Sequence, residues 1–359
     1  MPFTKIAGIG AYVPERVVTN NDLAQYMDTS DAWIRERTGI EERRYAKKHE
    51  ETTTTLGARA ARIAIERAGI TAEQVDFIVF ATLSPDYYFP GNGVLLQREL
   101  GITKTEIGAL DVRNQCSGFI YGLSVADQFV RSGMYKNVLL VGAEMHSMGL
   151  DFSTRGRGVT VIFGDGAGAV VLQPTEDEAE AVLTTKLHSD GTYAEKLAFI
   201  GPGTHGGYHH KKYGLEPDVP FEWAPEDEPG EIFITEDIRK HGSYPRMEGQ
   251  FVFKLAVTKF PEVIQEALDT AGLDKSDIDM LIPHQANLRI AQFVQKRLGL
   301  SDDQVFNNIQ KYGNTTAASI PIALCEAWEA GKIEPGDLVC LAAFGSGFTW
   351  GSALLRWAS

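Results

Sequence analysis

Residues 58–82, ARAARIAIERAGITAEQVDFIVFAT, set small and apolar residues at helical spacing before a turn and an apolar run typical of a buried strand. Residues 266–285, EALDTAGLDKSDIDMLIPHQ, repeat the same order of helix, turn, acidic spacer and strand. The Ala-Gly turn moves from Gly69 to Gly272, an offset of 203 residues. Internal similarity of this kind predicts a duplicated structural unit.

The repeat continues along the chain at an offset of 198 residues, which takes Gly101 to Gly299 and Gly133 to Gly331. A buried strand follows in each copy, NVLLVGAE in the first and DLVCLAAF in the second. Strands alternating with helices predict parallel sheets covered on both faces, an α/β fold. At this offset Cys116 corresponds to Asn314, and we expect the two to face each other across the junction of the copies, where ligand sites often lie.

The repeat predicts two domains, residues 1–174 and residues 175–359. Residues 191–245 interrupt the second copy with many turn-forming residues, an acidic run and one short expected strand, EIFIT. A loop of this length is either functional or a surface elaboration. Its histidines, His205, His209 and His210, lack convincing partner ligands, so no metal site is predicted there.

Composition excludes several classes of function. The chain has 359 residues, 43% of them hydrophobic, and its 34 Lys and Arg against 48 Asp and Glu give a net charge of -14. This charge repels nucleic-acid phosphates. No leader pattern or apolar run of about 18 residues is present, which predicts a cytoplasmic protein that does not span a membrane.

Three cysteines form neither a disulfide framework nor a CxxC metal motif. Cys325 and Cys340 lie in apolar runs and are interpreted as core residues. The glycines of FGDGAGAVVL lead into an expected strand and not a helix, which disfavours a dinucleotide loop. The sequence therefore predicts no metal and no cofactor.

Cys116 follows the apolar run IGALDV and begins a helical pattern. A helix start stabilises negative charge, so we expect a lowered thiol pKa, although a packed structural cysteine is the alternative. His284 lies at the end of a predicted strand, and Asn314 in a Gly-Asn turn before a helix; a buried structural histidine and a capping residue are the alternatives. Together, the three residue types favour covalent acyl-transfer catalysis.

Seven motifs, in order, resemble the β-ketoacyl-ACP synthase III enzymes of the thiolase superfamily. They are DTSDAWIRERTGI, the segment around Cys116, FGDGAGA, VFKLAV, PHQANLRI, YGNTTAAS and FGSGFTWGSALLRW, and they span nearly the whole chain. The resemblance implies a five-layered αβαβα thiolase-like fold built from two duplicated halves. It also implies a decarboxylative condensation of acyl-CoA with malonyl-ACP that begins fatty acid synthesis through an acyl-Cys116 intermediate.

The resemblance implies a role for each matching residue. Cys116, His284 and Asn314 would be catalytic, and the amides of Cys116 and Ser346 would form the oxyanion hole. Coenzyme A would contact Trp33, Arg37, Arg157, Gly249, Ala286 and Asn287. Phe344, and Phe89 from the partner of a homodimer, would line the acyl pocket. Lys254, Arg289, Lys296 and Arg297 would form a basic surface for an acidic acyl carrier protein, with an ordinary solvated helix face as the alternative.

Three features depart from the family pattern: Gln115 before the cysteine, Ser346 in the glycine loop, and the insert. All lie near the expected acyl channel, so they leave the acyl chain and the pathway open. Other functions remain possible. A related acyltransferase of secondary metabolism would use the same three residues, a non-decarboxylating thiolase would need a second active-site cysteine, and a non-catalytic partner subunit would not need Cys116.

Overall fold

The computed structural model describes residues 2–199 and 245–358. The strands are β1 (Phe3–Tyr12), β2 (Val17–Thr19), β3 (Glu42–Arg44), β4 (Phe77–Ala81), β5 (Gly108–Val112), β6 (Val138–Glu144), β7 (Gly166–Thr175), β8 (Val182–Ser189), β9 (Leu197–Ala198), β10 (Arg246–Met247), β11 (Met280–Pro283), β12 (Leu338–Gly345) and β13 (Thr349–Arg356). The α-helices are α1 (Asn20–Leu23), α2 (Asp31–Thr38), α3 (Thr53–Arg67), α4 (Asn92–Glu99), α5 (Gly118–Arg131), α6 (Arg157–Thr160), α9 (Gly249–Ala271), α10 (Leu288–Leu298), α11 (Ile309–Tyr312) and α12 (Ser319–Glu329).

Two mixed sheets organise the chain. The first sheet has the order β1-β7-β6-β4-β5, in which β4 is parallel to β5 and β6 while β7 is antiparallel to β1 and β6. The second sheet has the order β11-β12-β13-β8, with β11 parallel to β12 and the remaining pairs antiparallel. Each sheet thus mixes parallel and antiparallel pairs, whereas the sequence predicted parallel pairing alone.

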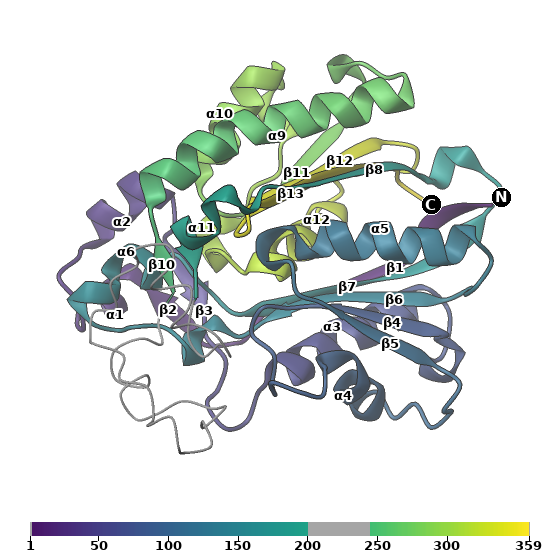
Figure 1. Ribbon diagram of the computed structural model, residues 1–359, viewed down its shortest axis with the longest axis horizontal. Helices are drawn as coiled ribbons and strands as arrows, with labels where there is room; N and C mark the ends of the chain where they lie inside the picture. Colours follow the sequence, from purple (N-terminus) through teal and green to yellow (C-terminus); the bar gives the residue numbers. More distant parts are fainter. Residues whose placement is uncertain (1, 200–244, 359) are drawn as a thin grey trace, which may run out of the picture.

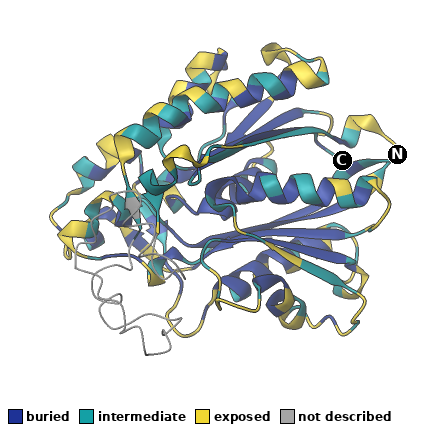
Figure 2. Ribbon diagram, in the orientation of Figure 1, coloured by how far each residue is buried: buried dark blue, intermediate teal, exposed yellow. Residues whose placement is uncertain are grey.

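The sheets and helices stack in five layers (Figure 1). Helices α3 and α4 cover the outer face of the first sheet, α5 and α12 lie between the sheets, and α9 and α10 cover the second sheet. The central strands are buried on both faces (Figure 2), and separate apolar clusters fill the spaces between the layers. The predicted five-layered thiolase-like architecture is confirmed.

Small residues explain how α3 approaches the first sheet so closely. A capping box of Thr52 with Thr55 begins the helix, and alanines at helical spacing face β1. A Cβ added to Gly8 would lie 2.2 Å from the Ala64 carbonyl oxygen, and one added to Gly10 would lie 2.4 Å from that of Ala60. The small-residue pattern therefore produces direct contact between the helix backbone and the strand.

The two copies also match in backbone conformation. Gly69 and Gly272 follow equivalent helices with φ angles of 68° and 67°, and the pairs Gly101 with Gly299 and Gly133 with Gly331 are also left-handed. Strand β5 is reduced in the second copy to a single parallel bridge between Leu281 and Val305. The repeated glycines therefore mark equivalent helix ends, as the sequence predicted.

At the central helices the structure corrects the predicted offset. Helix α5 has 14 residues and α12 has 11, so their starts, at residues 118 and 319, differ by 201 positions even though their ends keep the offset of 198. The preceding 3-10 turns, η2 (Gln115–Ser117) and η9 (Thr316–Ala318), begin with non-glycine residues at φ 45° and 50°. Cys116 is therefore equivalent to Ala317, and its predicted correspondence with Asn314 is wrong by three residues.

The insert is described only at its ends. Strands β9 and β10 pair as a short antiparallel ribbon, Leu197 with Met247. The expected strand EIFIT and the three insert histidines lie outside the described residues. None of the helices described is long and apolar enough to cross a membrane. Strand β7 ends at Thr175, and the division into two domains near that residue stays a prediction.

Candidate active site

Cys116 lies in turn η2, between β5 and α5, with 8% of its surface exposed. Its neighbour across the junction is the end of β12, where a Cβ added to Gly345 would lie 2.5 Å from the Cys116 Cβ and 3.0 Å from Sγ. The backbone N–H groups of Ser346 and of Cys116 itself donate to the sulfur. Two amides from different sheets therefore converge where negative charge would develop.

Burial raises the pKa of the Cys116 thiol to about 12, and the Glu144 carboxylate raises it further, while the two amides lower it. The direction is opposite to the predicted one. The helix α5 begins two residues after the cysteine, and loss of hydration outweighs the amide dipoles at a site this enclosed. The sequence showed the helix start but not the neighbouring carboxylate.

His284 follows the last residue of β11 and is buried. Its Nδ1 lies 2.6 Å from Ser319 Oγ, and that oxygen also accepts from the Gln285 N–H at 3.4 Å. The serine hydroxyl is thus available to donate to Nδ1, which assigns the ring proton to Nε2. Burial lowers the pKa of His284 to about 3, so the ring is neutral. Nε2 is buried with no hydrogen-bond partner among the described residues.

Asn314 follows Gly313, whose φ of 63° turns the chain out of α11. The Asn314 N–H donates to the Ile162 carbonyl at 2.8 Å, and its side-chain Oδ1 accepts from the Thr316 N–H at 2.8 Å. The Thr316 hydroxyl contacts His146 Nε2 at 2.7 Å. This chain of contacts assigns Oδ1 as the end facing the backbone and leaves the Nδ2 amide as a donor.

The segments carrying Cys116, His284 and Asn314 meet at the junction of the sheets. Turn η2 packs on turn η9, with a Cβ added to Gly118 at 3.4 Å from the Ala317 Cβ. His284 joins the same junction, because its N–H donates to the Ala342 carbonyl of β12 at 2.8 Å. The grouping predicted from the repeat is present, although the exact correspondence that suggested it is not.

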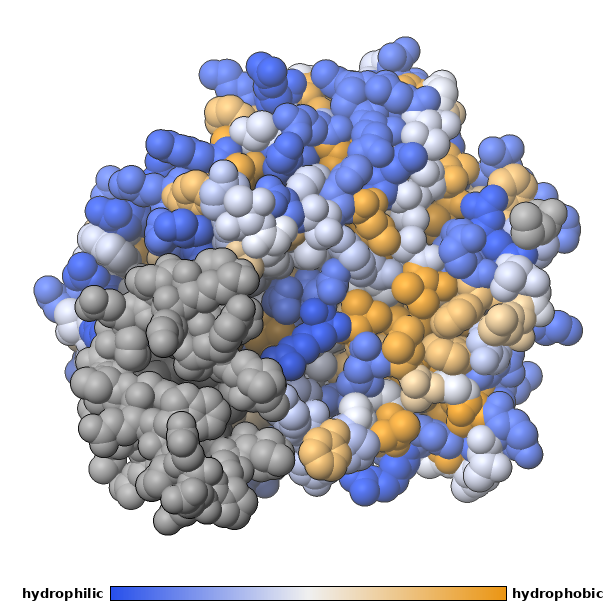
Figure 3. All heavy atoms as spheres, in the orientation of Figure 1, coloured by the Kyte–Doolittle hydropathy of each residue, from blue (hydrophilic) through white to orange (hydrophobic). Residues whose placement is uncertain are grey.

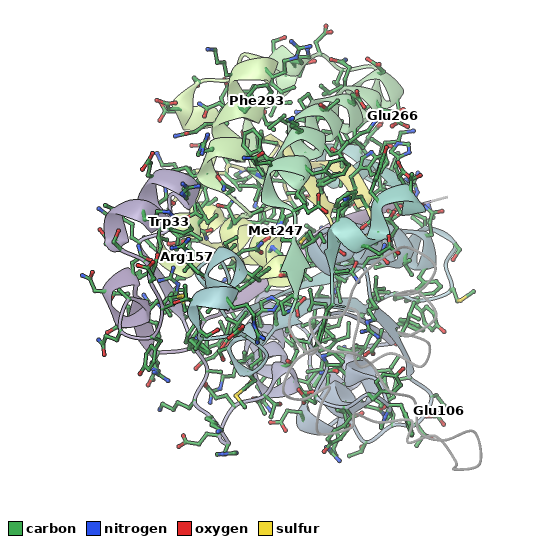
Figure 4. All side chains as sticks on the ribbon, turned by 60° about the vertical axis from the view of Figure 1, so that its left-hand side comes forward. Trp33, Glu106, Arg157, Met247, Glu266 and Phe293 are labelled. Atoms are coloured by element: carbon green, nitrogen blue, oxygen red, sulfur yellow. The ribbon has the colours of Figure 1, made fainter. Side chains whose placement is uncertain are left out.

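The predicted coenzyme A contacts gather on a rim formed by α2, α6 and the start of α10. The guanidinium carbons of Arg37 and Arg157 lie 4.6 and 4.8 Å from the Trp33 ring centroid, and Arg157 and Trp33 point toward each other in Figure 4. Arg157 also donates to the Asp28 carbonyl at 2.5 Å, and Asn287 donates to the Arg37 carbonyl at 2.9 Å.

The remaining predicted pocket residues differ in exposure. Gly249 begins α9 beside Met247, and Ala286 lies between His284 and α10. Phe344 is buried in β12 and stacks on Phe348 with 5.0 Å between ring centroids. Phe89 is 73% exposed, so within one chain it lines no acyl pocket.

The four predicted carrier-protein contacts are exposed on α9 and α10. Arg289 lies over the Phe253 ring at 5.7 Å, and within the described residues none of the four forms an ion pair. The four predicted carrier-protein contacts are Lys254, Arg289, Lys296 and Arg297. The surface therefore keeps its positive charge available to an external partner.

Sequence interpretation missed the residues that support the site. Ser319 fixes the His284 ring, His146 contacts Thr316, and Glu144 lies fully buried at the end of β6. A carboxylate closing the apolar run NVLLVGAE was visible in the sequence and was an available signal. Across the described residues, no group of three or more His, Cys, Asp or Glu is arranged to hold a metal ion.

Two family models match the chain. Residues 110–191 match the model described as 3-Oxoacyl-[acyl-carrier-protein (ACP)] synthase III, and residues 268–357 match the model of that family's C terminal region. The first match contains Cys116, and the second contains His284, Asn314 and Ser346.

Whole-chain relatives agree with these models. A β-ketoacyl-ACP synthase III of Xanthomonas campestris pv. campestris is 45% identical, covering 99% of this chain and 98% of the relative. One from Alkalilimnicola ehrlichii is 43% identical over 99% and 100%. The crystal structure of 3-oxoacyl-ACP synthase III from Aquifex aeolicus matches with a TM-score of 0.83 at 41% identity, covering 99% of this chain and all of that one.

Proposed function

The chain belongs to the β-ketoacyl-ACP synthase III family of condensing enzymes, and we propose that it joins an acyl-CoA to malonyl-ACP with loss of carbon dioxide. The product is a β-ketoacyl-ACP, and the reaction begins fatty acid synthesis. The observation that carries the assignment of roles is the His284 ring, which burial keeps neutral and whose buried Nε2 has no partner among the described residues.

In the first half-reaction, the Cys116 sulfur attacks the thioester carbonyl of acyl-CoA. The tetrahedral oxyanion accepts from the Cys116 and Ser346 amides, whose directions toward the sulfur support this role. Collapse breaks the bond to the coenzyme A sulfur, which departs with the thiol proton and leaves an acyl-Cys116 thioester. Thioester exchange of this kind carries little net energetic cost, so a thiol is a suitable nucleophile.

In the second half-reaction, malonyl-ACP loses carbon dioxide, and the electron pair of the broken bond becomes an enolate. His284 Nε2–H and Asn314 Nδ2–H donate to the enolate oxygen, and their role is supported by the tautomer and amide orientation set by Ser319 and Thr316. The enolate carbon then attacks the acyl carbonyl and expels the Cys116 thiolate, which takes up a proton. No metal or redox cofactor enters this balance.

The substrate-binding roles complete the proposal. Trp33, Arg37 and Arg157 hold the nucleotide of coenzyme A, with Gly249, Ala286 and Asn287 along its pantetheine arm. The exposed cations of α9 and α10 attract the acidic carrier protein, as their charge on a chain of net charge -14 supports. The acyl chain lies near Phe344. A cytoplasmic location is part of the same proposal.

A homodimer would supply Phe89 to the acyl pocket. The loop carrying Tyr87, Tyr88 and Phe89 exposes three aromatic side chains, and Leu110 on edge strand β5 is 39% exposed. Figure 3 shows apolar side chains gathered on the face over the first sheet and α5. An unpaired edge beside an apolar surface favours association with a second copy. Light scattering coupled to gel filtration tests this, with a mass near twice the chain mass of 39.4 kDa expected.

The alternatives are disfavoured. The 43–45% identical relatives that span almost the whole chain are named as β-ketoacyl-ACP synthases III, which argues against an ester-forming enzyme of secondary metabolism. A thiolase would need a second cysteine at the site, and Cys325 and Cys340 are buried inside α12 and β12. Cys116 with its converging amides argues against a non-catalytic subunit.

The test is product analysis. The enzyme is mixed with malonyl-ACP and a panel of straight and branched acyl-CoAs, and the mass of the carrier protein is followed. We expect its malonyl group to lose the mass of carbon dioxide and gain that of the acyl group. Unchanged malonyl-ACP with every donor contradicts a condensing function, and an acyl ester of a different acceptor supports the secondary-metabolism alternative.

A further inference from the structure

Glu144 is a buried carboxylate that the proposed mechanism does not use. It ends β6 with none of its surface exposed. Burying an ionised carboxylate is unfavourable unless hydrogen bonds replace its hydration. Burial accordingly raises the pKa of Glu144 to about 7, even though several donors act in the opposite direction. A group this unfavourable to bury, whose charge also acts on the Cys116 thiol, is expected to have a role.

The donors to Glu144 come from both sheets. From the loop after β4, Thr82 Oγ1 donates at 3.1 Å, the Leu83 and Ser84 N–H groups at 3.1 Å, and Ser84 Oγ at 2.5 Å. From turn η9, the Ala317 N–H donates as well. The carboxylate therefore joins the loop that leads to Phe89 to the turn that follows Asn314.

The contact with η9 is close because β6 has a glycine there. A Cβ added to Gly142 would lie 2.4 Å from the Ala317 carbonyl oxygen. Ala317 lies next to Thr316, whose N–H orients the Asn314 amide. Through this turn, Glu144 positions the segment that presents Asn314 without contacting substrate.

Glu144 also acts on Cys116 through its charge, since it is the carboxylate that raises the pKa of that thiol. Among the described residues, the elements that hold Glu144 offer no compensating cation. The loop 82–84 and turn η9 contribute only hydroxyl and amide groups, and His146, two residues further along, is kept neutral because burial lowers its pKa to about 3. Turn η2 packs on turn η9, where a Cβ added to Gly118 would lie 3.4 Å from the Cβ of Ala317, the residue whose N–H donates to Glu144. Cys116 is the titratable group of turn η2 on which the Glu144 charge acts.

We propose that Glu144 is a positioning residue of the condensing site: its carboxylate holds turn η9 and the loop after β4 together, and its charge opposes the thiolate of Cys116. The role of this second effect rests on the proposed function of Cys116 as nucleophile. Burial keeps the Cys116 thiol protonated in the resting enzyme, so the repulsion acts on the transient thiolate of acyl transfer and not on the neutral acyl-enzyme. The charge of Glu144 therefore disfavours the free thiolate relative to the acyl thioester.

The experiment measures the pH dependence of Cys116 alkylation by iodoacetamide, with the modified residue assigned by peptide mass spectrometry. It compares wild type, Glu144→Gln and Asp165→Asn. Asp165 is a matched control, because it is also a buried carboxylate with a pKa raised by burial, to about 6, held by the Ser147 hydroxyl and backbone amides. Unlike Glu144, it is not among the groups that shift the Cys116 thiol.

In Glu144→Gln we expect the alkylation midpoint to fall by about one pH unit, which is a tenfold larger thiolate fraction above about pH 8, where the wild-type carboxylate is ionised, and in Asp165→Asn we expect no change. If Glu144→Gln is insoluble, Glu144→Met removes the same charge from a side chain of similar length, so the midpoint should again fall. An unchanged or raised midpoint in either folded Glu144 variant overturns the proposal. Alkylation needs no turnover, so this result is independent of whether the enzyme condenses malonyl-ACP.

Positioning is read separately from charge by Glu144→Asp, which keeps the charge and shortens the reach. We expect its alkylation midpoint to stay within about 0.5 pH unit of wild type while kcat for condensation falls about tenfold and KM for acyl-CoA is unchanged. A wild-type kcat in this variant removes the positioning role.

Discussion

Turns η2 and η9 occupy equivalent places in the two copies and do different work. Each presses on a glycine of the other sheet, η2 on Gly345 and η9 on Gly142. At the second position of η2 stands Cys116, whose sulfur receives two amides, while at the same position of η9 stands Ala317, whose amide is given to the Glu144 carboxylate. Turn η2 thus carries the nucleophile, and turn η9 is anchored by a buried carboxylate.

This difference teaches how a duplicated unit acquires one active site. The helix starts, the left-handed first residues and the close glycine contacts are shared, so the backbone frame belongs to both turns. The difference in chemistry comes from the side chains at the second position of each turn, a thiol in Cys116 and a methyl group in Ala317. On the η9 side the Ala317 amide donates to a fixed carboxylate, whereas on the η2 side the Cys116 amide donates to the sulfur.

The largest expected effect comes from removing the nucleophile. Cys116→Ala should lower condensation by about 10⁴-fold or more, because the Ser117 and Thr316 hydroxyls of the two turns are weaker nucleophiles and are held in other hydrogen bonds. Cys325→Ala is the matched control, a buried cysteine outside the junction, and it should keep activity within a few-fold of wild type. The assay is β-ketoacyl-ACP formation. If both variants lost condensation activity to a similar extent, the loss could not be assigned to the position of Cys116 in turn η2.

His284→Ala and Asn314→Ala should each lower condensation by about 10²- to 10³-fold, since each deletes one donor to the enolate. Both should still become acylated by acyl-CoA, which intact mass measurement would show. Ser319→Ala, which frees the His284 ring without removing it, should have a smaller effect of about tenfold. Loss of acylation in the Asn314 variant would place that residue in the first half-reaction instead.

The carboxylate of the η9 side should make stability depend on pH. The folded pKa of Glu144 is raised to about 7 from 4.5, so the folded state binds the extra proton between these values. Its stabilising contribution is complete below about pH 4 and is lost as pH rises through 7. Relative to Glu144→Gln, wild type should lose about 3 kcal/mol of unfolding free energy from pH 4 to pH 8. Urea unfolding at several pH values measures this, and a constant difference between the two proteins would contradict it.

A smaller effect is expected at the loop that faces η2. Ser346 Oγ donates to the Leu197 carbonyl in β9, while the amide of Ser346 points to Cys116. Ser346→Ala keeps the amide and loses only this support, so we expect a fall in kcat of about three- to tenfold, in keeping with the loss of one hydrogen bond. Steady-state kinetics with a fixed acyl-CoA would check it, and a loss above a hundredfold would mean that the hydroxyl itself contacts substrate.

Much of the fold followed from local pattern. The duplicated architecture was predictable because local sequence patterns indicate its elements. Glycines indicate helix ends, small residues indicate the closely packed helix α3, and apolar runs indicate buried strands. The exact match of the copies was not, because α12 is three residues shorter than α5 and the glycines that set the register lie at the helix ends. Aligning the two copies by these glycines does not reveal a difference in length at the start of the helix.

The candidate site likewise has a part that was predictable from local sequence and a part that was not. Cys116, His284 and Asn314 follow recognisable strand ends or turns, so they could be found from the sequence. The raised pKa of Cys116 comes first from burial and then from the Glu144 charge, and both arise only after the chain has folded. Ser319 and His146 are likewise defined by partners at separations of 35 and 170 residues. Long-range contacts of this kind determine electrostatics and tautomers, and no local pattern predicts them.

Intact mass spectrometry of the enzyme is the most direct test of the central claim. Wild type incubated with acyl-CoA should gain one acyl mass, mapped to Cys116, and addition of malonyl-ACP should discharge it while β-ketoacyl-ACP appears. Cys116→Ala should gain no such mass. Failure of every acyl donor to label a folded wild-type enzyme, or labelling that malonyl-ACP does not discharge, would contradict the account.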